Sequence, residues 1–306
     1  MTDRLLWERD GVDWPNRESS RFVEAGGLMW HVQQMGQGPV LLLLHGTGAS
    51  THSWRDLAPR LAAQFTVIAP DLPGHGFTAM PAPAQLSLTG MARAVADLVD
   101  VLGLTIAGAV GHSAGAAIAV QMVFGRRIAP QVVMGMNAAL LPLDGAARVL
   151  FPPTARLMAA TSLAPRLFAW RASDRTAVTR LIDGTGSTLD ERGLALYGRL
   201  VGDVKHVSAA LGMMARWNLE NLESRLRGLE VPLSLLVGAR DRAVPPAHAR
   251  RVLAGLPLTT PATLTVLDGL GHLAHEEQPE AAARFIVDAM AATEPRVRVR
   301  AAGGRS

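Results

Sequence analysis

One serine of this chain has neighbours that suggest a role in catalysis. The stretch AVGHSAGAA places Ser113 between Gly111 and Gly115 at two-residue spacing. The apolar run LTIAGAV before it predicts a short buried strand, and AAIAVQMVF after it has the length and periodicity of a helix. A serine in such a strand-turn-helix can be a nucleophile, because the strained turn exposes its hydroxyl at the end of a sheet. The alternative is a glycine-rich turn whose serine caps the helix.

Two other residues have the types and positions of the acid and base that a serine nucleophile needs. Asp241 follows an apolar run in VGARDRAVPP, where its carboxylate can hold an imidazole or fix a turn. His272 lies in LDGLGHLAHEEQPE, in a glycine-flanked loop between the last predicted strand and the last predicted helix. A serine, an aspartate and a histidine in this chain order, each at the end of a predicted strand, are far more specific evidence for a catalytic triad than any one of them. The sequence therefore predicts a Ser113, Asp241, His272 triad.

The turn HGTG predicts hydrogen-bond donors for the negative charge that develops on the substrate oxygen in such a reaction. The turn follows the apolar run VLLLL, so the backbone N–H of Thr47 is expected at the edge of the sheet. Together with the backbone N–H of Ala114, it would form an oxyanion hole. We interpret the neighbouring His45 as a packed residue that orients this turn.

No metal ion or cofactor is predicted for this chain. His275 and Glu276 lie close to His272, but the spacing H-E-x-x-H is absent and no third ligand is evident. We expect His275 to cap or pack the last helix, and His112 to shape the turn beside the serine. Neither glycine-rich nucleotide motif follows the HGTG turn, which argues against nucleotide binding.

The segments around these residues predict an α/β fold, with a mostly parallel sheet and helices on both of its faces. Helical patterns such as SLTGMARAVADLVDVLG alternate with apolar runs along the chain. The runs that predict strands begin at Leu28, Val40, Phe65, Ile106, Val132, Leu233 and Thr263.

One long interval without a strand pattern interrupts this alternation, between Asn137 and Val231. A wholly helical insertion there predicts a cap over the carboxyl ends of the strands, the edge at which open α/β sheets bind ligands. The predicted organisation is a hydrolase-like core at 1–141, a helical cap at 142–227, the rest of the core at 228–294 and a basic flexible tail at 295–306.

Apolar side chains of the cap are expected to form a wide, adaptable pocket for a small apolar substrate. Most of them should be core residues, because apolar stripes at helical spacing usually are. Methionines repack readily, so those that face the cleft would let it adapt. The predicted pocket residues are Leu140, Met158, Trp170, Met213 and Trp217.

Composition excludes several function classes. The chain has 306 residues, 49% of them hydrophobic, which suits one large domain, and it has no cysteine for disulfides or thiolate catalysis. Basic residues are scattered outside the tail and aromatics are only 5%, so no nucleic-acid partner is predicted. The N-terminus lacks the pattern of a secretory signal and no run is long enough to cross a bilayer. We therefore expect a cytoplasmic protein, whose basic tail leaves weak membrane-surface contact open.

The motifs HGTG, DLPGHG, GHSAG, GARDRAVPP and GHLAHEEQP resemble the α/β-hydrolase superfamily over nearly the whole chain. The resemblance implies the α/β-hydrolase fold and a serine hydrolase with the triad given above. Haloalkane dehalogenases and epoxide hydrolases use an aspartate where this chain has Ser113, so those activities are disfavoured.

The stretches DWPNRESSRFV, WHVQ and MNAALLPLDG are similar to the BchO family of magnesium-chelatase accessory proteins in bacteriochlorophyll synthesis. This resemblance implies a role near magnesium insertion into protoporphyrin IX, with magnesium-chelatase subunits as partners. The leading hypothesis is a serine esterase for an apolar substrate such as a porphyrin ester. Two alternatives stay open: a non-catalytic tetrapyrrole-binding or chelatase accessory protein, and a cofactor-independent hydrolase of carbon-carbon bonds.

Overall fold

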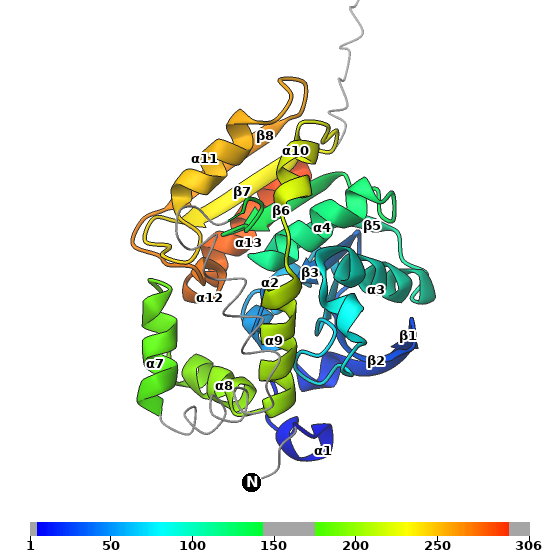
Figure 1. The fold of residues 1–306 in the computed structure, drawn as a ribbon, viewed down its shortest axis with the longest axis vertical. Coiled ribbons are helices and arrows are strands. Elements are labelled where there is room, and N and C mark those ends of the chain that lie inside the picture. Colours follow the sequence, from blue (N-terminus) through cyan, green and yellow to red (C-terminus); the bar gives the residue numbers. More distant parts are fainter. Residues whose placement is uncertain (1–4, 143–174, 294–306) are drawn as a thin grey trace, which may run out of the picture.

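An eight-stranded sheet forms the centre of the computed structural model, which describes residues 5–142 and 175–293 (Figure 1). The strand order is β1-β2-β4-β3-β5-β6-β7-β8. β2 runs antiparallel to β1 and β4, and the other neighbouring strands are parallel. The strands are β1 Ser20–Ala25, β2 Leu28–Met35, β3 Val40–Leu44, β4 Thr66–Pro70, β5 Ile106–His112, β6 Val132–Met136, β7 Leu233–Gly238 and β8 Ala262–Leu267.

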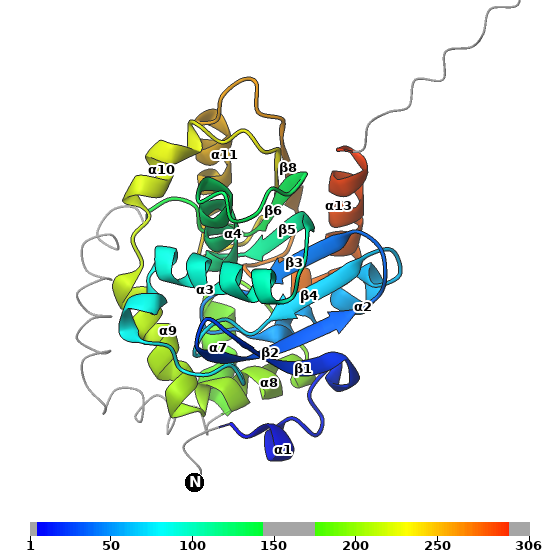
Figure 2. The same ribbon diagram turned by 90° about the vertical axis from the view of Figure 1, so that its right-hand side faces the viewer.

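Helices cover both faces of this sheet (Figures 1 and 2). One face carries α3 (Leu88–Val101), α4 (Ala114–Phe124) and α11 (Pro246–Ala254), and the other carries α2 (Ala58–Leu61) and α13 (Pro279–Ala291). Short helices are α1 Trp7–Asp10, η1 Arg17–Ser19, η2 Thr51–Trp54, η3 Pro83–Leu86 and α12 Ala274–Glu277. In the described residues, no helix is long and apolar enough to cross a membrane.

The run VLLLL of β3 shows why a central strand is apolar on both faces. Leu42 and Leu44 pack into the core beneath α3 and α4. Leu41 and Leu43 point the other way, into the core beneath α2 and α13. All four side chains are fully buried, because both faces of a parallel sheet are covered by helices.

Between β6 and β7, the described residues form four helices, which we call the inserted helices: α7 Arg175–Gly184, α8 Glu191–Val201, α9 Val204–Arg216 and α10 Glu220–Leu226. No strand occurs from 175 to 226. α7, α8 and α9 gather at one end of the molecule, next to α1 (Figures 1 and 2). The predicted tail at 295–306 and the part of the predicted cap at 143–174 lie outside the described residues.

The predicted α/β-hydrolase architecture is confirmed, and every predicted strand is present. Strand β1 was not predicted. Of its residues SRFVEA only Ala25 is buried, so this edge strand lacks the apolar alternation from which strands are inferred.

Candidate active site

Ser113 lies at the sharp turn between β5 and α4, with φ 51° and ψ −116°. This strained conformation depends on the two flanking glycines. A Cβ on Gly111 would lie 2.2 Å from the backbone nitrogen of Ala116, and one on Gly115 would lie 2.0 Å from the carbonyl oxygen of Leu44. The turn therefore requires glycine at both positions, and it projects the serine from the end of the sheet.

The carboxylate of Asp241 is held just beyond β7 by four hydrogen bonds. Its Oδ1 accepts the backbone N–H groups of Ala243 and Val244, both at 2.8 Å. Its Oδ2 accepts the amide of Asn137 and Nδ1–H of His272, both also at 2.8 Å. With Nδ1 of the imidazole donating, Nε2 of neutral His272 keeps its lone pair and can accept a proton.

Asn137 follows β6 directly and was not among the predicted site residues. It adopts the left-handed conformation, with φ 48°, and its amide also donates to the carbonyl of Gly271 at 3.2 Å. Its position after a central strand is the one signal that sequence offers for it, because that edge of the sheet carries the other site residues.

The loop that carries His272 is fixed by its backbone as well as by Asp241. The carbonyl of His272 accepts Nε2–H of His112 at 2.9 Å, and its N–H donates to the carbonyl of Thr185 at 3.3 Å. Burial lowers the pKa of His112 well below its usual range, so this imidazole is neutral. His112 thus links the turn beside Ser113 to the loop of His272, in keeping with the turn-shaping role expected for it.

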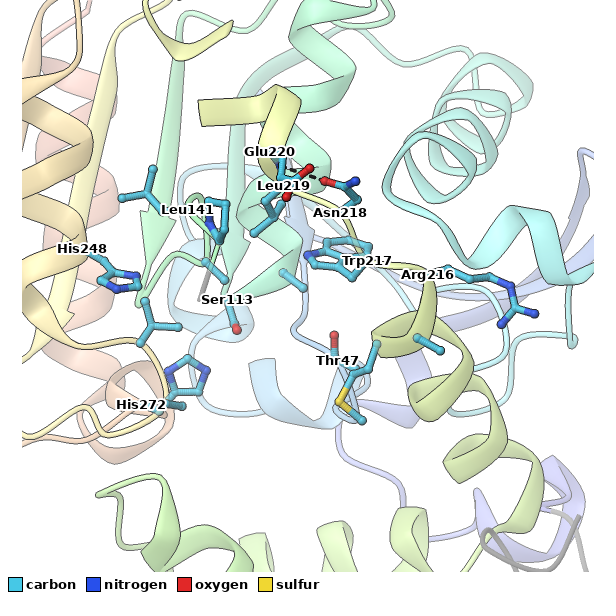
Figure 3. Close-up of a pocket in the computed structure, with 17 residues that line it drawn as sticks. Thr47, Ser113, Leu141, Arg216, Trp217, Asn218, Leu219, Glu220, His248 and His272 are labelled. Carbon is cyan, nitrogen blue, oxygen red and sulfur yellow. Dashed lines mark hydrogen bonds between the residues drawn. The ribbon is translucent and has the colours of Figure 1, made fainter. Parts of the chain in front are cut away.

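A cavity of about 480 Å³ adjoins these residues, and Ser113 and His272 both line it. Figure 3 shows the serine hydroxyl directed toward the imidazole of His272, with Thr47 at the other side. The hydroxyl and the imidazole make no hydrogen bond with each other; between a serine nucleophile and its base, such a bond often forms only when substrate binds. Most of the wall is apolar, including Ala139, Leu141 and Trp217. Polar and charged residues also line it: Arg216, Asn218, Glu220 and His248.

The cavity wall differs from the predicted pocket at two positions. Leu140 and Met213 are buried in the core and do not line the described cavity, whereas their neighbours Leu141 and Met214 do. Successive residues point in different directions, so a shift of one residue decides which side chain meets the cavity. Trp217, also among the residues predicted for the pocket, lines the cavity. The other two predicted pocket residues, Met158 and Trp170, lie outside the described residues.

The peptide between Gly46 and Thr47 is oriented by His45. Nδ1–H of His45 donates to the carbonyl of Gly46 at 2.8 Å, and its Nε2 accepts the backbone N–H of Leu72 at 2.9 Å. Burial lowers the pKa of His45 to about 3, so the ring is neutral. In a trans peptide the N–H points opposite to the C=O, so the N–H of Thr47 faces away from His45. Of the described residues, none accepts a hydrogen bond from the N–H of Thr47 or of Ala114.

A buried polar cluster lies behind the loop of His272. Glu276 accepts hydrogen bonds from the Tyr197 hydroxyl, at 2.7 Å, and from the Arg55 guanidinium. Burial raises the pKa of Glu276 to about 7, and Arg55 opposes that rise. The cluster ties inserted helix α8 to α12 and to the core.

In the described part of the chain, no group of His, Cys, Asp and Glu is placed to hold a metal ion.

Residues 41–285 match the family model of the alpha/beta hydrolase family, and the chain belongs to this family. It is 40% identical over 279 residues to the magnesium-chelatase 30 kDa subunit of Rhodobacter capsulatus, covering 90% of this chain and 96% of that one. This identity also places the two chains in one family.

More distant relatives include hydrolases with named substrates. The 2-hydroxy-6-oxononadienedioate/2-hydroxy-6-oxononatrienedioate hydrolase 2 of Pseudomonas putida is 28% identical over 300 residues, covering 90% of this chain and 98% of its own. Among solved structures, the epoxide hydrolase CorEH superposes with a TM-score of 0.75 at 22% identity, covering 89% of this chain and 98% of its own. That likeness shows the fold alone.

Proposed function

We propose that this chain is a serine hydrolase for an apolar ester, with Ser113 as nucleophile, His272 as base and Asp241 as the acid that holds the imidazole. One observation carries the proposal: Ser113 sits strained at the end of β5 and shares a cavity with His272, whose Nδ1 is bonded to Asp241. A serine, an imidazole and a buried carboxylate in these roles form the machinery of acyl transfer.

The reaction uses these groups in two halves. Nε2 of His272 accepts the hydroxyl proton as Oγ of Ser113 attacks the ester carbonyl, and the N–H groups of Thr47 and Ala114 bind the resulting oxyanion. The imidazolium then gives its proton to the departing alkoxide, which leaves an acyl group on the serine. Water attacks the acyl-enzyme, His272 takes its proton and returns it to Oγ, and the carboxylic acid is released.

The cavity supports a substrate with a sizeable apolar group. Its walls include Leu141, Leu219 and Trp217, and an aromatic ring at the wall can stack on a flat substrate. The 40% identity to a magnesium-chelatase subunit supports a porphyrin ester as substrate and chelatase subunits as partners.

Labelling with a fluorophosphonate probe tests the proposal without knowledge of the natural substrate. We expect the wild type to be labelled and Ser113→Ala to be unlabelled. Ser224→Ala is the matched control, because that serine is exposed and its hydroxyl bonds only the carbonyl of Asn221 on its own helix. Labelling that persists in Ser113→Ala would show that another residue is the nucleophile.

A carbon-carbon bond hydrolase is a second candidate, favoured by two relatives named as hydrolases of hydroxy-oxo-dienoates, each 28% identical. The same serine, histidine and aspartate can serve that reaction. Incubation with 2-hydroxy-6-oxo-6-phenylhexa-2,4-dienoate, the compound in one relative's name, separates the two. Loss of the dienoate absorbance with no turnover of p-nitrophenyl esters would favour this candidate.

A non-catalytic tetrapyrrole carrier is a third candidate, favoured by the chelatase relative alone. Titration with protoporphyrin IX and its magnesium form, followed by tryptophan quenching, tests it. Ala139 lines the cavity, so Ala139→Leu would narrow it and shows whether a porphyrin binds there. Saturable binding that Ala139→Leu weakens, in a protein that no fluorophosphonate labels, would favour the carrier over the hydrolase.

A further inference from the structure

Inserted helix α9 contacts the turn formed by residues 46–49, which overlaps the HGTG motif at 45–48, at two points. Nε2–H of His206 donates to the carbonyl of Gly48 at 3.1 Å. The sulfur of Met213 accepts the hydroxyl of Thr47 at 3.4 Å. His206 and Met213 are two helical turns apart, so one face of α9 lies along the turn that carries the proposed oxyanion donor.

His206 is a neutral imidazole whose proton position is fixed by its partners. Its Nδ1 lies 3.0 Å from the backbone N–H of Gly76, which can only donate. Its Nε2 faces the carbonyl of Gly48, which can only accept. Burial lowers the pKa of His206 to about 4, so the ring is uncharged at neutral pH. One side chain of an inserted helix thus joins two loops of the core.

The start of α9 is itself held in place, so His206 is presented from a fixed point. Oδ1 of Asp203 accepts the backbone N–H groups of Lys205 and His206, at 2.7 and 2.9 Å. This side chain satisfies donors in the first turn that have no partner within the helix. The imidazole then packs edge-on against His75, with ring centroids 5.1 Å apart.

The bond from His206 reaches the N–H of Thr47 through two consecutive contacts. His206 holds the carbonyl of the Gly48–Ala49 peptide, and the N–H of the same peptide donates to the carbonyl of Gly46 at 3.2 Å. The carbonyl of Gly46 belongs to the peptide whose N–H is that of Thr47, and the two point in opposite directions. A fixed direction for one therefore fixes the other.

The turn needs such support because its sequence does not impose one conformation. Gly48 has φ 77°, in the left-handed region that glycine enters without steric cost. The same freedom lets the turn adopt other conformations when its hydrogen bonds are lost. His45 binds the carbonyl of Gly46 and His206 binds the carbonyl of Gly48, so these two hydrogen bonds stabilise the observed conformation of the turn.

We propose that His206 is a positioning residue through which helix α9 holds the N–H of Thr47 in the direction required of an oxyanion donor. The inference rests on the proposed function and deepens it. The inserted helices then contribute to the chemical step as well as to the cavity wall. Displacement of α9 would lower turnover even with the triad intact.

Three variants of the full chain test this role. His206→Ala removes both hydrogen bonds, and His206→Gln can restore them because its amide both donates and accepts. Ser208→Ala is the control on the same helix, since the Ser208 hydroxyl bonds only the carbonyl of Val204. For a p-nitrophenyl ester we expect His206→Ala to lower kcat about ten-fold with KM within two-fold, below the 10²–10³-fold cost of losing an oxyanion donor. His206→Gln should recover most of the loss, and Ser208→Ala should match the wild type.

Two further readouts separate positioning from a general loss of stability. An alkyl boronic acid forms a tetrahedral adduct on a catalytic serine, so its inhibition constant should rise in parallel with the fall in kcat. Hydrogen exchange at the peptides of the turn 46–49 should be faster in His206→Ala at a temperature where far-UV circular dichroism shows both proteins folded. An unchanged boronate constant in a variant with reduced kcat would overturn the proposal, and so would unchanged exchange.

The exchange measurement also distinguishes the failure of this inference from the failure of the proposed hydrolase function. If the wild type is unlabelled by fluorophosphonate and hydrolyses no ester, the hydrolase proposal fails, yet exchange at the turn 46–49 still shows whether His206 holds it. If the wild type is active and His206→Ala equals it in kcat, boronate affinity and exchange, only the positioning role fails.

Discussion

Asn137 connects the end of β6 to the carboxylate of Asp241 through a hydrogen bond. Replacement of Asn137 by glycine measures how much this hydrogen bond contributes to activity. The backbone there has φ 48°, which glycine adopts without strain, so Asn137→Gly removes the amide and leaves the backbone unstrained. The amide bonds to Asp241 and Gly271 are lost. Asp241 keeps two backbone donors on Oδ1, while Oδ2 keeps only the imidazole it is meant to hold.

The expected effect follows from the type of bond that is removed. A hydrogen bond to a charged group contributes about 1.5–3 kcal/mol, and each 1.4 kcal/mol in the activation barrier is a factor of about ten in rate. We therefore expect Asn137→Gly to lower kcat/KM for a p-nitrophenyl ester by about 10- to 100-fold. The effect should stay below the roughly 10⁴-fold cost of replacing a triad aspartate.

Asn16→Gly is the matched control for this change. Asn16 also lies in the left-handed region, with φ 56°, and its amide also donates to a backbone carbonyl, that of Arg55, at 3.1 Å. It reports the cost of losing a left-handed asparagine that has no contact with Asp241. A folded Asn137→Gly protein with kcat/KM within two-fold of the wild type would refute the reasoning. An equal loss in Asn16→Gly would refute it as well.

Three other changes have expected outcomes. In His275→Phe, two buried ring nitrogens without a hydrogen-bond partner in the described residues disappear, so the free energy of unfolding at pH 7 should rise by about 1–3 kcal/mol. Burial lowers the pKa of His275 to about 3, so the free energy of unfolding of the wild type falls as pH decreases from 6.5 toward 3. The stability gained by His275→Phe, measured by urea unfolding, should therefore be larger at pH 5 than at pH 7. An equal gain at the two pH values would contradict this expectation. Tyr197→Phe breaks the 2.7 Å bond to buried Glu276 and should cost about 1–3 kcal/mol in the same assay, whereas unaltered stability would show that the carboxyl group does not need the hydroxyl. Gly46→Ala would place a Cβ 2.8 Å from Nδ1 of His112, so we expect reduced fluorophosphonate labelling in a folded protein; labelling at the wild-type rate would mean that the turn tolerates the methyl group.

Strands β2 to β8 could be predicted from the sequence because they have local apolar patterns, and the proposed triad positions were inferred from the ends of those strands. Ser113 and Asp241 follow apolar runs that are strands β5 and β7, and His272 lies beyond β8. Parallel strands bring their carboxyl ends to one edge, so residues far apart in the chain become neighbours once the strands are recognised. The hydrogen bond between His272 and Asp241 spans 31 residues in this way.

Long-range support of the site could not be predicted from the sequence. The hydrogen bond from His206 to the carbonyl of Gly48 spans 158 residues. No sequence pattern around a single histidine on a helix predicts which distant residue it contacts. Asn137 is likewise a single polar residue after a strand. At the cavity wall, the choice between Met213 and Met214 depends on the rotation of α9, which is decided by packing on the core.

Three buried histidines support the candidate site by the same physical means. His45, His112 and His206 each donate one ring N–H to a backbone carbonyl, and burial lowers the pKa of each. A protonated ring could not accept the backbone N–H groups that His45 and His206 also bind, so these two must be neutral for the turn 46–49 to keep its shape. Because their pKa values are about 3 and about 4, the turn should persist in the folded protein down to about pH 5. Activity that declines at a higher pH would then report the titration of a group other than His45 and His206.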